Sequence, residues 1–512
     1  MAYIQLFKKK EYKTALLATL FFAILAHGYI CLHKVSIMDD AVYQFDVGGT
    51  YTSGRWALGI LYKLTTVFGK SAFSLPLFNS ALGFMFLALT VCFFSALFRI
   101  KDTLLVIAVS GILVVYPAVT GLMAYQYTVP YYFFGLLLVT AGVYLFERRS
   151  DLPFVACGIV FVTCGIAIYQ AYLTFAVAIV LILGILYLTD TEDFQNRRFV
   201  WYVGRMLLLI VASLVLYLII NRAVLSAMHA QMVDYRGMRT FGATTLPGYL
   251  ARIVDAYVLF FKPSGVASHE MYPARMRIFF YAALLIAIVC AGRVIEIVKR
   301  EGGARVVWFV VMLALSPLCF NLIFVITGVS EVHSLMMHTQ VLFFFLVAAL
   351  IERLTDTRNL FYASYLCVLI ALDLLLARYA NVCYLGAAYM QSEAASYFQN
   401  LAGRVQATEG YTPDMEVVYI GEYDKDGDVL PVYDQFSVIQ TFPYPHSAKE
   451  LINYYTWKDF CALWCGFDPP LGDATRYEHL RRVKDMPVYP ADGSVQIIDG
   501  RIVVKFADTQ TE

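Results

Sequence analysis

The chain has 512 residues, of which 60% are hydrophobic and 15% charged, and its formal net charge is +1. This apolar fraction lies above the range of soluble globular domains and places most of the chain in a lipid bilayer. The near-neutral charge and the lack of a Lys/Arg-rich tail exclude the electrostatic pattern of a nucleic-acid-binding protein.

Eleven apolar segments are long enough to cross a bilayer as helices. The first follows the basic sequence MAYIQLFKKKEYK without a small-x-small cleavage site, so we expect a retained helix rather than a signal peptide. Tyr169 and Gln170 separate two segments with almost no loop, which predicts a tight turn at one membrane face. The sequence therefore predicts a polytopic α-helical membrane protein with spans near residues 14–32, 74–98, 103–119, 129–146, 152–169, 172–188, 205–221, 277–292, 306–326, 338–352 and 360–378.

The short connections between these segments alternate in charge. Those around residues 117–128, 169–171 and 327–337 contain no Lys or Arg, whereas the opposite set is basic. Because basic connections remain in the cytoplasm, the pattern predicts a cytoplasmic N-terminus and, with eleven spans, an extracytoplasmic C-terminus. The basic set comprises residues 8–13, 99–101, 147–151, 190–205, 293–305 and 353–358.

Three pieces of the chain are then expected outside the membrane. Two are outer loops, at residues 33–73 and 222–276, and the third is the tail. We expect residues 1–380 to form a membrane domain and residues 381–512 to form a small extracytoplasmic α+β domain.

The tail has the patterns of a small folded domain. QSEAASYFQNLAGRVQATEG predicts an amphipathic helix that ends at Gly410. MEVVYIG predicts a buried strand, and SVQIIDGRIVVKF predicts a hairpin that turns at Asp499-Gly500.

The first outer loop opens with a cluster of acids in the sequence HKVSIMDDAVYQFDVGGTYTSGRWALGIL, residues 33–61. Asp39 and Asp40 follow the first span closely, which places them at headgroup depth, where a carboxylate stays charged and reaches the lipid surface. Asp39 could simply cap a short interfacial helix. One acid is enough for a cap, however, and adjacent acids repel each other, so the pair favours a functional role.

Three short motifs in the membrane domain resemble a known family. Met38-Asp39-Asp40, Ser53-Gly54-Arg55-Trp56 and Tyr169-Gln170 are similar to motifs of the GtrII family of bacterial glucosyltransferases, in the GT-C superfamily of integral-membrane glycosyltransferases. The resemblance covers roughly residues 1–380. It implies a GT-C-like fold in the bacterial cytoplasmic membrane. It also implies a polyprenyl-phosphate sugar as donor and a surface glycan such as O-antigen as acceptor.

The chemistry of such a transfer matches these residue types. An acceptor hydroxyl loses a proton as it attacks, and Asp40 or Asp39 is a suitable general base for an inverting displacement. The resemblance makes Arg55 a contact for the departing phosphate or for the acids, although Arg55 and Trp56 could equally be an interfacial anchor. Aromatic faces that could stack on the sugar belong to Trp56, Tyr125 and Tyr127, and Tyr169 and Gln170 join the expected site through the family motif.

Further polar residues are expected at the outer end of the bundle. Lys262 and His269 in the second outer loop could assist the leaving phosphate, as could His338 and Arg378 at the ends of later spans. The other charged residues of that loop are better interpreted as solvated, around an interfacial helix LPGYLARIVDAYVLFF. Paired acids can also hold a divalent cation, but without a nearby histidine cluster we expect no metal or other cofactor.

Two ionisable residues, His27 and Asp373, lie inside predicted spans, where a charge is costly. We interpret both as packing contacts that face the interior of the bundle.

Two other classes of function remain open. A flippase or transporter of lipid-linked oligosaccharide would usually place its polar site at mid-membrane and show internal symmetry, which this chain does not. A polymerase or ligase would also work at the outer face, and the arginines of the 222–276 loop keep that class open.

Overall fold

The computed structural model describes residues 9–36, 39–42, 49–66, 74–233, 244–263, 274–299, 302–354, 358–422 and 457–508. These residues form two compact units. The first unit contains the described residues of 9–34 and 49–382, and the second contains those of 35–42 and 383–508.

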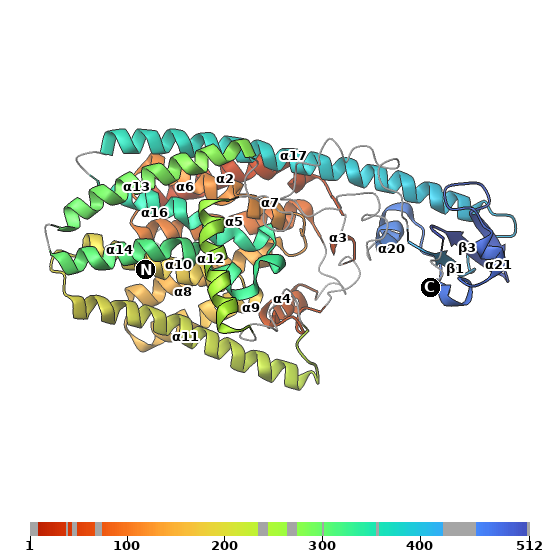
Figure 1. Ribbon diagram of the computed structural model, residues 1–512, viewed down its shortest axis with the longest axis horizontal. Helices are drawn as coiled ribbons and strands as arrows, with labels where there is room; N and C mark the ends of the chain where they lie inside the picture. The colour runs from red at the N-terminus through yellow and green to blue at the C-terminus, as the bar shows by residue number, and fades with distance from the viewer. Residues whose placement is uncertain are drawn as a thin grey trace. The chain divides into compact units, whose positions relative to one another are not determined.

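The first unit is a helical bundle (Figure 1). Ten helical stretches of the described chain are long and apolar enough to cross a membrane, and Leu152–Ile168 is a shorter apolar helix. A helix therefore covers each of the eleven predicted spans, which confirms a polytopic helical membrane protein. The α-helices of this unit are α2 (Lys10–Leu32), α4 (Trp56–Thr65), α5 (Pro76–Phe98), α6 (Thr103–Val115), α7 (Pro117–Leu122), α8 (Val129–Arg148), α9 (Leu152–Ile168), α10 (Tyr172–Asp190), α11 (Asn196–Ala227), α12 (Leu246–Phe261), α13 (Arg277–Lys299), α14 (Gly303–Phe320), α15 (Leu322–Thr327), α16 (Leu342–Glu352) and the first part of α17 (Arg358–Gln406).

Burial separates the interior helices from the outer ones. Nearly every residue of α6 and α16 is buried, whereas α11 and α13 expose large apolar side chains such as Trp201 and Ile278. Exposed apolar side chains on spanning helices suit contact with lipid, where the backbone groups are already satisfied within the helix. The segment LPGYLARIVDAYVLFF forms the helix α12, as predicted, and this helix lies across the direction of α11 and α14 in Figure 1.

Four glycines bring α8 and α9 unusually close together. A Cβ on Gly142 would lie 2.7 Å from the carbonyl oxygen of Gly158, and one on Gly165 would lie 2.6 Å from that of Gly135. Each helix thus presents two glycines seven residues apart, which lets the backbones approach as small residues do between membrane helices. This contact fixes where the ends of both helices lie, including Tyr132 and Tyr169.

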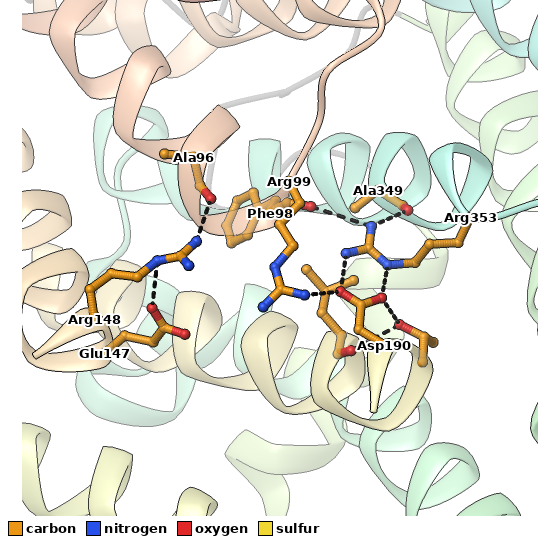
Figure 2. A network of polar contacts seen from close by, with 10 residues as sticks. Ala96, Phe98, Arg99, Glu147, Arg148, Asp190, Ala349 and Arg353 are labelled. Atoms are coloured by element: carbon orange, nitrogen blue, oxygen red, sulfur yellow. Dashed lines mark hydrogen bonds and ion pairs between the residues drawn. The ribbon is translucent and has the colours of Figure 1, made fainter. Parts of the chain in front are cut away.

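A network of ion pairs ties together three helix ends (Figure 2). Asp190, at the end of α10, forms ion pairs with Arg99 at 2.8 Å and with Arg353 at 2.5 Å. Arg353 also donates to the carbonyl oxygens of Phe98 and Ala349. These residues come from three connections of the basic set, so the structure gathers those connections at one end of the bundle.

The second unit is a small α+β structure. Its helical elements are α3 (Asp39–Val42), the last part of α17, α20 (Trp457–Phe460), the π-helix η5 (Cys461–Cys465), the 3-10 helix η6 (Ala474–Arg476) and α21 (Arg481–Lys484). Three strands, β1 (Val417–Ile420), β2 (Val495–Ile498) and β3 (Arg501–Lys505), form a sheet in the order β1-β3-β2. β1 is parallel to β3, and β2 is antiparallel to it.

The predicted strand and hairpin are both present. Asp499 and Gly500 have φ values of 50° and 75° in the turn between β2 and β3. Positive φ at both central residues is the requirement of a tight two-residue hairpin turn, and Asp-Gly meets it at low cost. One face of the sheet buries Val418, Ile420 and Val503 in the core of this unit.

One predicted boundary in the tail is wrong. The span at 360–378 and the amphipathic helix expected to end at Gly410 are a single helix, α17, of 49 residues. No proline interrupts Arg358–Gln406, so nothing in the backbone forces a break. The helix ends at Gln406, and Gly410 follows in a turn with φ 85°.

We expect Asp190→Ala to lower the free energy of unfolding by about 2 kcal/mol, because it leaves two guanidinium groups facing each other with their shared carboxylate removed. Thermal unfolding in detergent measures the change. Glu296→Ala, which removes the exposed partner of Arg293, is the matched control and should cost less than about 1 kcal/mol. Equal effects of the two substitutions would contradict a structural role for the network.

Candidate active site

The two adjacent acids of the first outer loop begin a short helix in the second unit. Asp39 and Asp40 open α3, with Asp39 half-buried and Asp40 fully buried. The hydroxyl of Ser36 donates to Oδ2 of Asp40 at 3.0 Å, and the backbone N–H of Ser36 donates to Oε1 of Gln391 at 2.6 Å. Gln391 belongs to α17, so a residue of the tail helix fixes the segment that carries the acids.

The helix α20 packs against α3 and adds a third acid to this region. Asp459 of α20 is half-buried, and its pKa is raised first by desolvation and then by the charge of Asp468. A carboxyl group with a raised pKa can hold a proton closer to neutral pH than an exposed one. Sequence analysis did not single out Asp459, because it lies more than 400 residues from α3 in the chain.

In the first unit, a tight turn presents the second predicted motif. Residues 49–55 form this turn, in which the N–H of Arg55 donates to the carbonyl of Thr50 at 3.0 Å. Gly54 has φ 81°, and a Cβ there would lie 2.7 Å from Oη of Tyr217. Only glycine fits this position, because it needs both left-handed backbone and the absence of a side chain.

The structure brings the Gly54 turn and the Tyr169-Gln170 turn together. Nε2 of Gln170 donates to the carbonyl of Ser53 at 2.7 Å, and the hydroxyl of Tyr217 donates to the carbonyl of Gly54 at 3.0 Å. Two motifs more than 100 residues apart thus form one hydrogen-bonded unit, held by a tyrosine of α11 that sequence analysis missed.

Arg55 and Trp56 lie at the start of α4. Nη1 of Arg55 donates to the hydroxyl of Tyr132 at 3.0 Å, and the side chain of Arg55 is half-buried. Trp56 is buried, and its indole N–H has no hydrogen-bond partner among the described residues. A half-buried guanidinium that a phenol holds in place is well suited to bind an oxyanion.

Tyr132 starts a continuous series of ring contacts, which we call the aromatic row. The ring of Tyr132 stacks on that of Tyr169 with centroids 4.7 Å apart. The series continues inward through contacts of 5.2, 5.8, 5.3 and 6.2 Å between neighbouring ring centroids. Its members in order are Tyr132, Tyr169, Tyr172, Phe175, His338 and Tyr116.

Two histidines stabilise a break in the bundle interior at Pro117. Proline has no N–H, and the extended backbone of Tyr116 (ψ 138°) ends α6, so the last carbonyls of α6 lose their helical donors. Nε2 of His338 lies 3.2 Å from the carbonyl of Leu113, and Nε2 of His27 lies 3.0 Å from that of Val114. A carbonyl oxygen only accepts, so both rings carry a hydrogen on Nε2.

Hydrogen-bonded amides lie at a second break, between α14 and α15. α14 ends beside Asn321, whose Nδ2 donates to the carbonyl of Ala256 in α12 at 2.8 Å. Gln340, in the 3-10 helix η4 (Ser334–Val341), donates from Nε2 to Oδ1 of Asn321 at 2.6 Å and accepts from the hydroxyl of Tyr116 at 2.9 Å. These hydrogen bonds connect Tyr116, beside the first break, with Asn321 at the second. The side-chain amides of Asn321 and Gln340 therefore have hydrogen-bond partners inside the bundle.

His27 and Asp373, both expected as packing contacts in the interior of the bundle, differ in their hydrogen bonding. Both side chains are fully buried, and His27 is hydrogen-bonded. Asp373 packs against Gly111 of α6, and its carboxyl oxygens have no hydrogen-bond partner in the described part of the chain.

The remaining predicted residues lie in different settings. Tyr125 is half-buried and Tyr127 is buried, in the turn that follows α7. Lys262 is exposed at the end of α12, and Arg378 is exposed on α17. His269 lies outside the described residues.

Within the described ranges, no group of three His, Cys, Asp or Glu side chains could hold a metal ion. The groups suited to sugar transfer among the residues described above are the carboxylates of α3 and α20, the Arg55 guanidinium and the aromatic rings. Four further residues hold these groups or their turns in place, and no short motif marks them in the sequence. They are Ser36, Tyr132, Tyr217 and Gln391.

Comparison with known proteins gives one match. A protein-family model described as "Glucosyl transferase GtrII" matches residues 28–350. This range is more than half of the chain and contains the acids of α3, the Gly54 turn and the Tyr169-Gln170 turn. Comparisons with curated proteins and with solved structures found no match.

We expect Gly54→Ala to destabilise the protein by about 1–3 kcal/mol, because the new Cβ meets Tyr217 and φ 81° is unfavourable for alanine. Gly204→Ala on α11, where a Cβ would meet nothing within 4 Å, is the control and should be neutral or slightly stabilising. Melting temperatures in detergent compare the two. A Gly54→Ala protein as stable as the control would show that the turn does not need glycine.

Proposed function

The chain belongs to the GtrII family of glucosyl transferases, and we propose that it moves a hexose, glucose, from undecaprenyl-phosphate-sugar to a cell-surface glycan such as O-antigen. The family match confirms the suspected GtrII family, and together with the spanning helices it makes the chain a membrane glucosyltransferase. The donor, the acceptor and the inverting course of the reaction belong to the proposal.

The observation that carries the mechanism is the setting of Asp40. Its carboxylate is fully buried and accepts a hydrogen bond from Ser36, so its orientation is fixed. In a single displacement, the acceptor hydroxyl attacks the anomeric carbon as the bond to phosphate breaks. The carboxylate takes the hydroxyl proton, and the bonding electrons leave with the polyprenyl phosphate. We assign the base to Asp40 rather than to Asp39, because the hydroxyl of Ser36 orients the carboxylate of Asp40.

The departing phosphate gains charge and needs a cationic partner. Arg55 is the best candidate, because Tyr132 holds its guanidinium and the side chain is half-buried rather than covered. Planar paired donors on a guanidinium match two phosphate oxygens. The ring of Tyr132 is itself stacked on that of Tyr169, and both rings are buried, so the hydroxyl that holds Arg55 has a fixed position.

The proposed location is the bacterial cytoplasmic membrane, with the N-terminus in the cytoplasm and the acids outside. The support is the charge of the connections. Arg99 and Arg353 meet at Asp190 at one end of the bundle, and both belong to the basic set that the positive-inside rule assigns to the cytoplasm.

A carrier of lipid-linked oligosaccharide is the alternative from another class. Breaks at Pro117 and Asn321 favour it, because transporters form their sites from discontinuous helices. Here, however, His27 and His338 donate to the freed carbonyls at the end of α6, and the amides of Asn321 and Gln340 are hydrogen-bonded to Ala256 and to each other, which favours a structural role for both breaks. A carrier would move lipid across vesicles without forming a glycosidic bond.

We expect Asp40→Asn to reduce transfer of labelled sugar from its polyprenyl phosphate by about 10²–10⁴-fold, because the amide cannot accept the proton. Asp39→Asn should have a smaller effect. Asp485→Asn, which changes an exposed carboxylate of the same unit, is the control and should keep full activity. Full turnover by Asp39→Asn, Asp40→Asn and the double variant would exclude this base.

The contacts of Ser36 make a second prediction. Ser36→Ala and Gln391→Ala should each lower kcat about tenfold with little change in KM, because each removes one hydrogen bond that orients Asp40. Ser36→Thr, which keeps the hydroxyl, should restore activity. Gln399→Ala, at an exposed position of the same helix, is the control. A fall in thermal stability that accounts for the loss of activity would contradict positioning and indicate a purely structural role.

A further inference from the structure

The second unit contains a polar pocket at the edge of its sheet. The pocket has a volume of about 240 Å³ and is lined by Glu416, Leu471, Asp473, Arg476, Tyr477 and Arg501. None of these residues contributes to the site proposed for the transfer reaction.

The floor of the pocket is held by the pairing of two strands. β1 and β3 run parallel with Val417 opposite Ile502, which places the preceding residues Glu416 and Arg501 side by side. Nε of Arg501 donates to Oε2 of Glu416 at 2.5 Å, and its Nη1 donates to the hydroxyl of the buried Tyr477 at 3.0 Å. Because these hydrogen bonds hold Arg501 against Glu416 and Tyr477, the polar side chains of the floor are preorganised.

The wall is a segment that extends the sheet beyond β1. The N–H of Val417 donates to the carbonyl of Pro470, and the N–H of Gly472 donates to the carbonyl of Val417. A Cβ on Gly472 would lie 2.5 Å from Cγ2 of Val418 and 3.3 Å from Oε2 of Glu416. Glycine therefore lets this segment approach closely enough to enclose the floor.

The rim carries one fixed carboxylate. Oδ1 of Asp473 accepts from the backbone N–H of Thr475 at 3.0 Å and from its hydroxyl at 2.7 Å. The hydrogen bond from the Thr475 hydroxyl is the largest cause of a lowered pKa for Asp473, so the group is a charged acceptor at neutral pH. The neighbouring Arg476 is exposed and supplies donors.

The balance of charge identifies the class of ligand. Two carboxylates and two guanidinium groups line the pocket, so either an anion or a cation would face two like charges. A neutral molecule with several hydroxyls both donates to carboxylates and accepts from guanidinium groups. Leu471, which is 51% exposed, offers an apolar contact for the C–H face of a sugar ring.

The size of the pocket limits the ligand to one ring. A volume of about 240 Å³ lies below the range of roughly 300–1,000 Å³ typical of drug-sized ligands. We propose that this pocket binds one neutral sugar residue of the glycan that the enzyme modifies. The saccharide class follows from the pocket alone, whereas its assignment to the acceptor rests on the proposed function.

The test uses the full-length protein in lipid nanodiscs, free of glycoside detergent and without a lipid-linked donor. Glucose, galactose, mannose and rhamnose are each added at millimolar concentration, and saturation-transfer difference NMR measures their binding. Inorganic phosphate is added as a competing anion. The pocket variant is D473N/R476Q, and R481Q/D485N makes the same charge changes at an exposed pair that does not line the pocket.

We expect at least one sugar to bind, and binding to weaken by about tenfold or more in D473N/R476Q but not in R481Q/D485N. Phosphate should not compete. In a transfer assay, D473N/R476Q should raise KM for the acceptor and leave KM for the donor unchanged.

The proposal is overturned if none of the sugars binds, if the pocket variant binds like the wild type, or if phosphate displaces the sugar. A change in KM for the donor alone would overturn the assignment to the acceptor. Sugar binding by a wild-type protein that transfers no sugar would support the pocket and reject only the proposed function.

Discussion

A backbone carbonyl inside a membrane has no water to bond, and this constraint governs the interior of the bundle. Pro117 follows the end of α6 within the apolar stretch Thr103–Leu122, and the last carbonyls of α6 lose their helical donors there. His27 and His338 replace those donors from two other helices, so three helices are fixed to one another at a single point. The aromatic row ends at this point with His338 and Tyr116, and at its other end Tyr132 holds Arg55.

The proposed phosphate-binding residue, Arg55, and the proposed base, Asp40, are held by different contacts. Arg55 is held within the first unit by the Gly54 turn and by Tyr132, through bonds to a rigid pair of helices. Asp40 is held within the second unit through Ser36 and Gln391. The tail therefore supplies a residue, Gln391, that helps to orient the proposed base.

Much of the fold was predictable because it follows from local patterns. The lengths of the apolar runs predicted the helices, and Asp499-Gly500 predicted the hairpin. The motifs of the Gly54 and Gln170 turns were also visible, but their contact was not. Tyr132 and Tyr217 look like ordinary aromatic residues of apolar helices, and only tertiary packing shows that their hydroxyls face these turns. Ser36 and Gln391 could not be paired from sequence, since 355 residues separate them.

That separation has a consequence for biosynthesis. The segment that carries Asp40 leaves the ribosome long before Gln391 exists, and at 5–20 residues per second the delay is about 20–70 s. During this time the bundle can insert while the acidic segment lacks its hydrogen-bond partner on α17. In a nascent or prematurely terminated chain, the segment with the proposed base would then lack the contact that Gln391 makes with Ser36 in the finished protein.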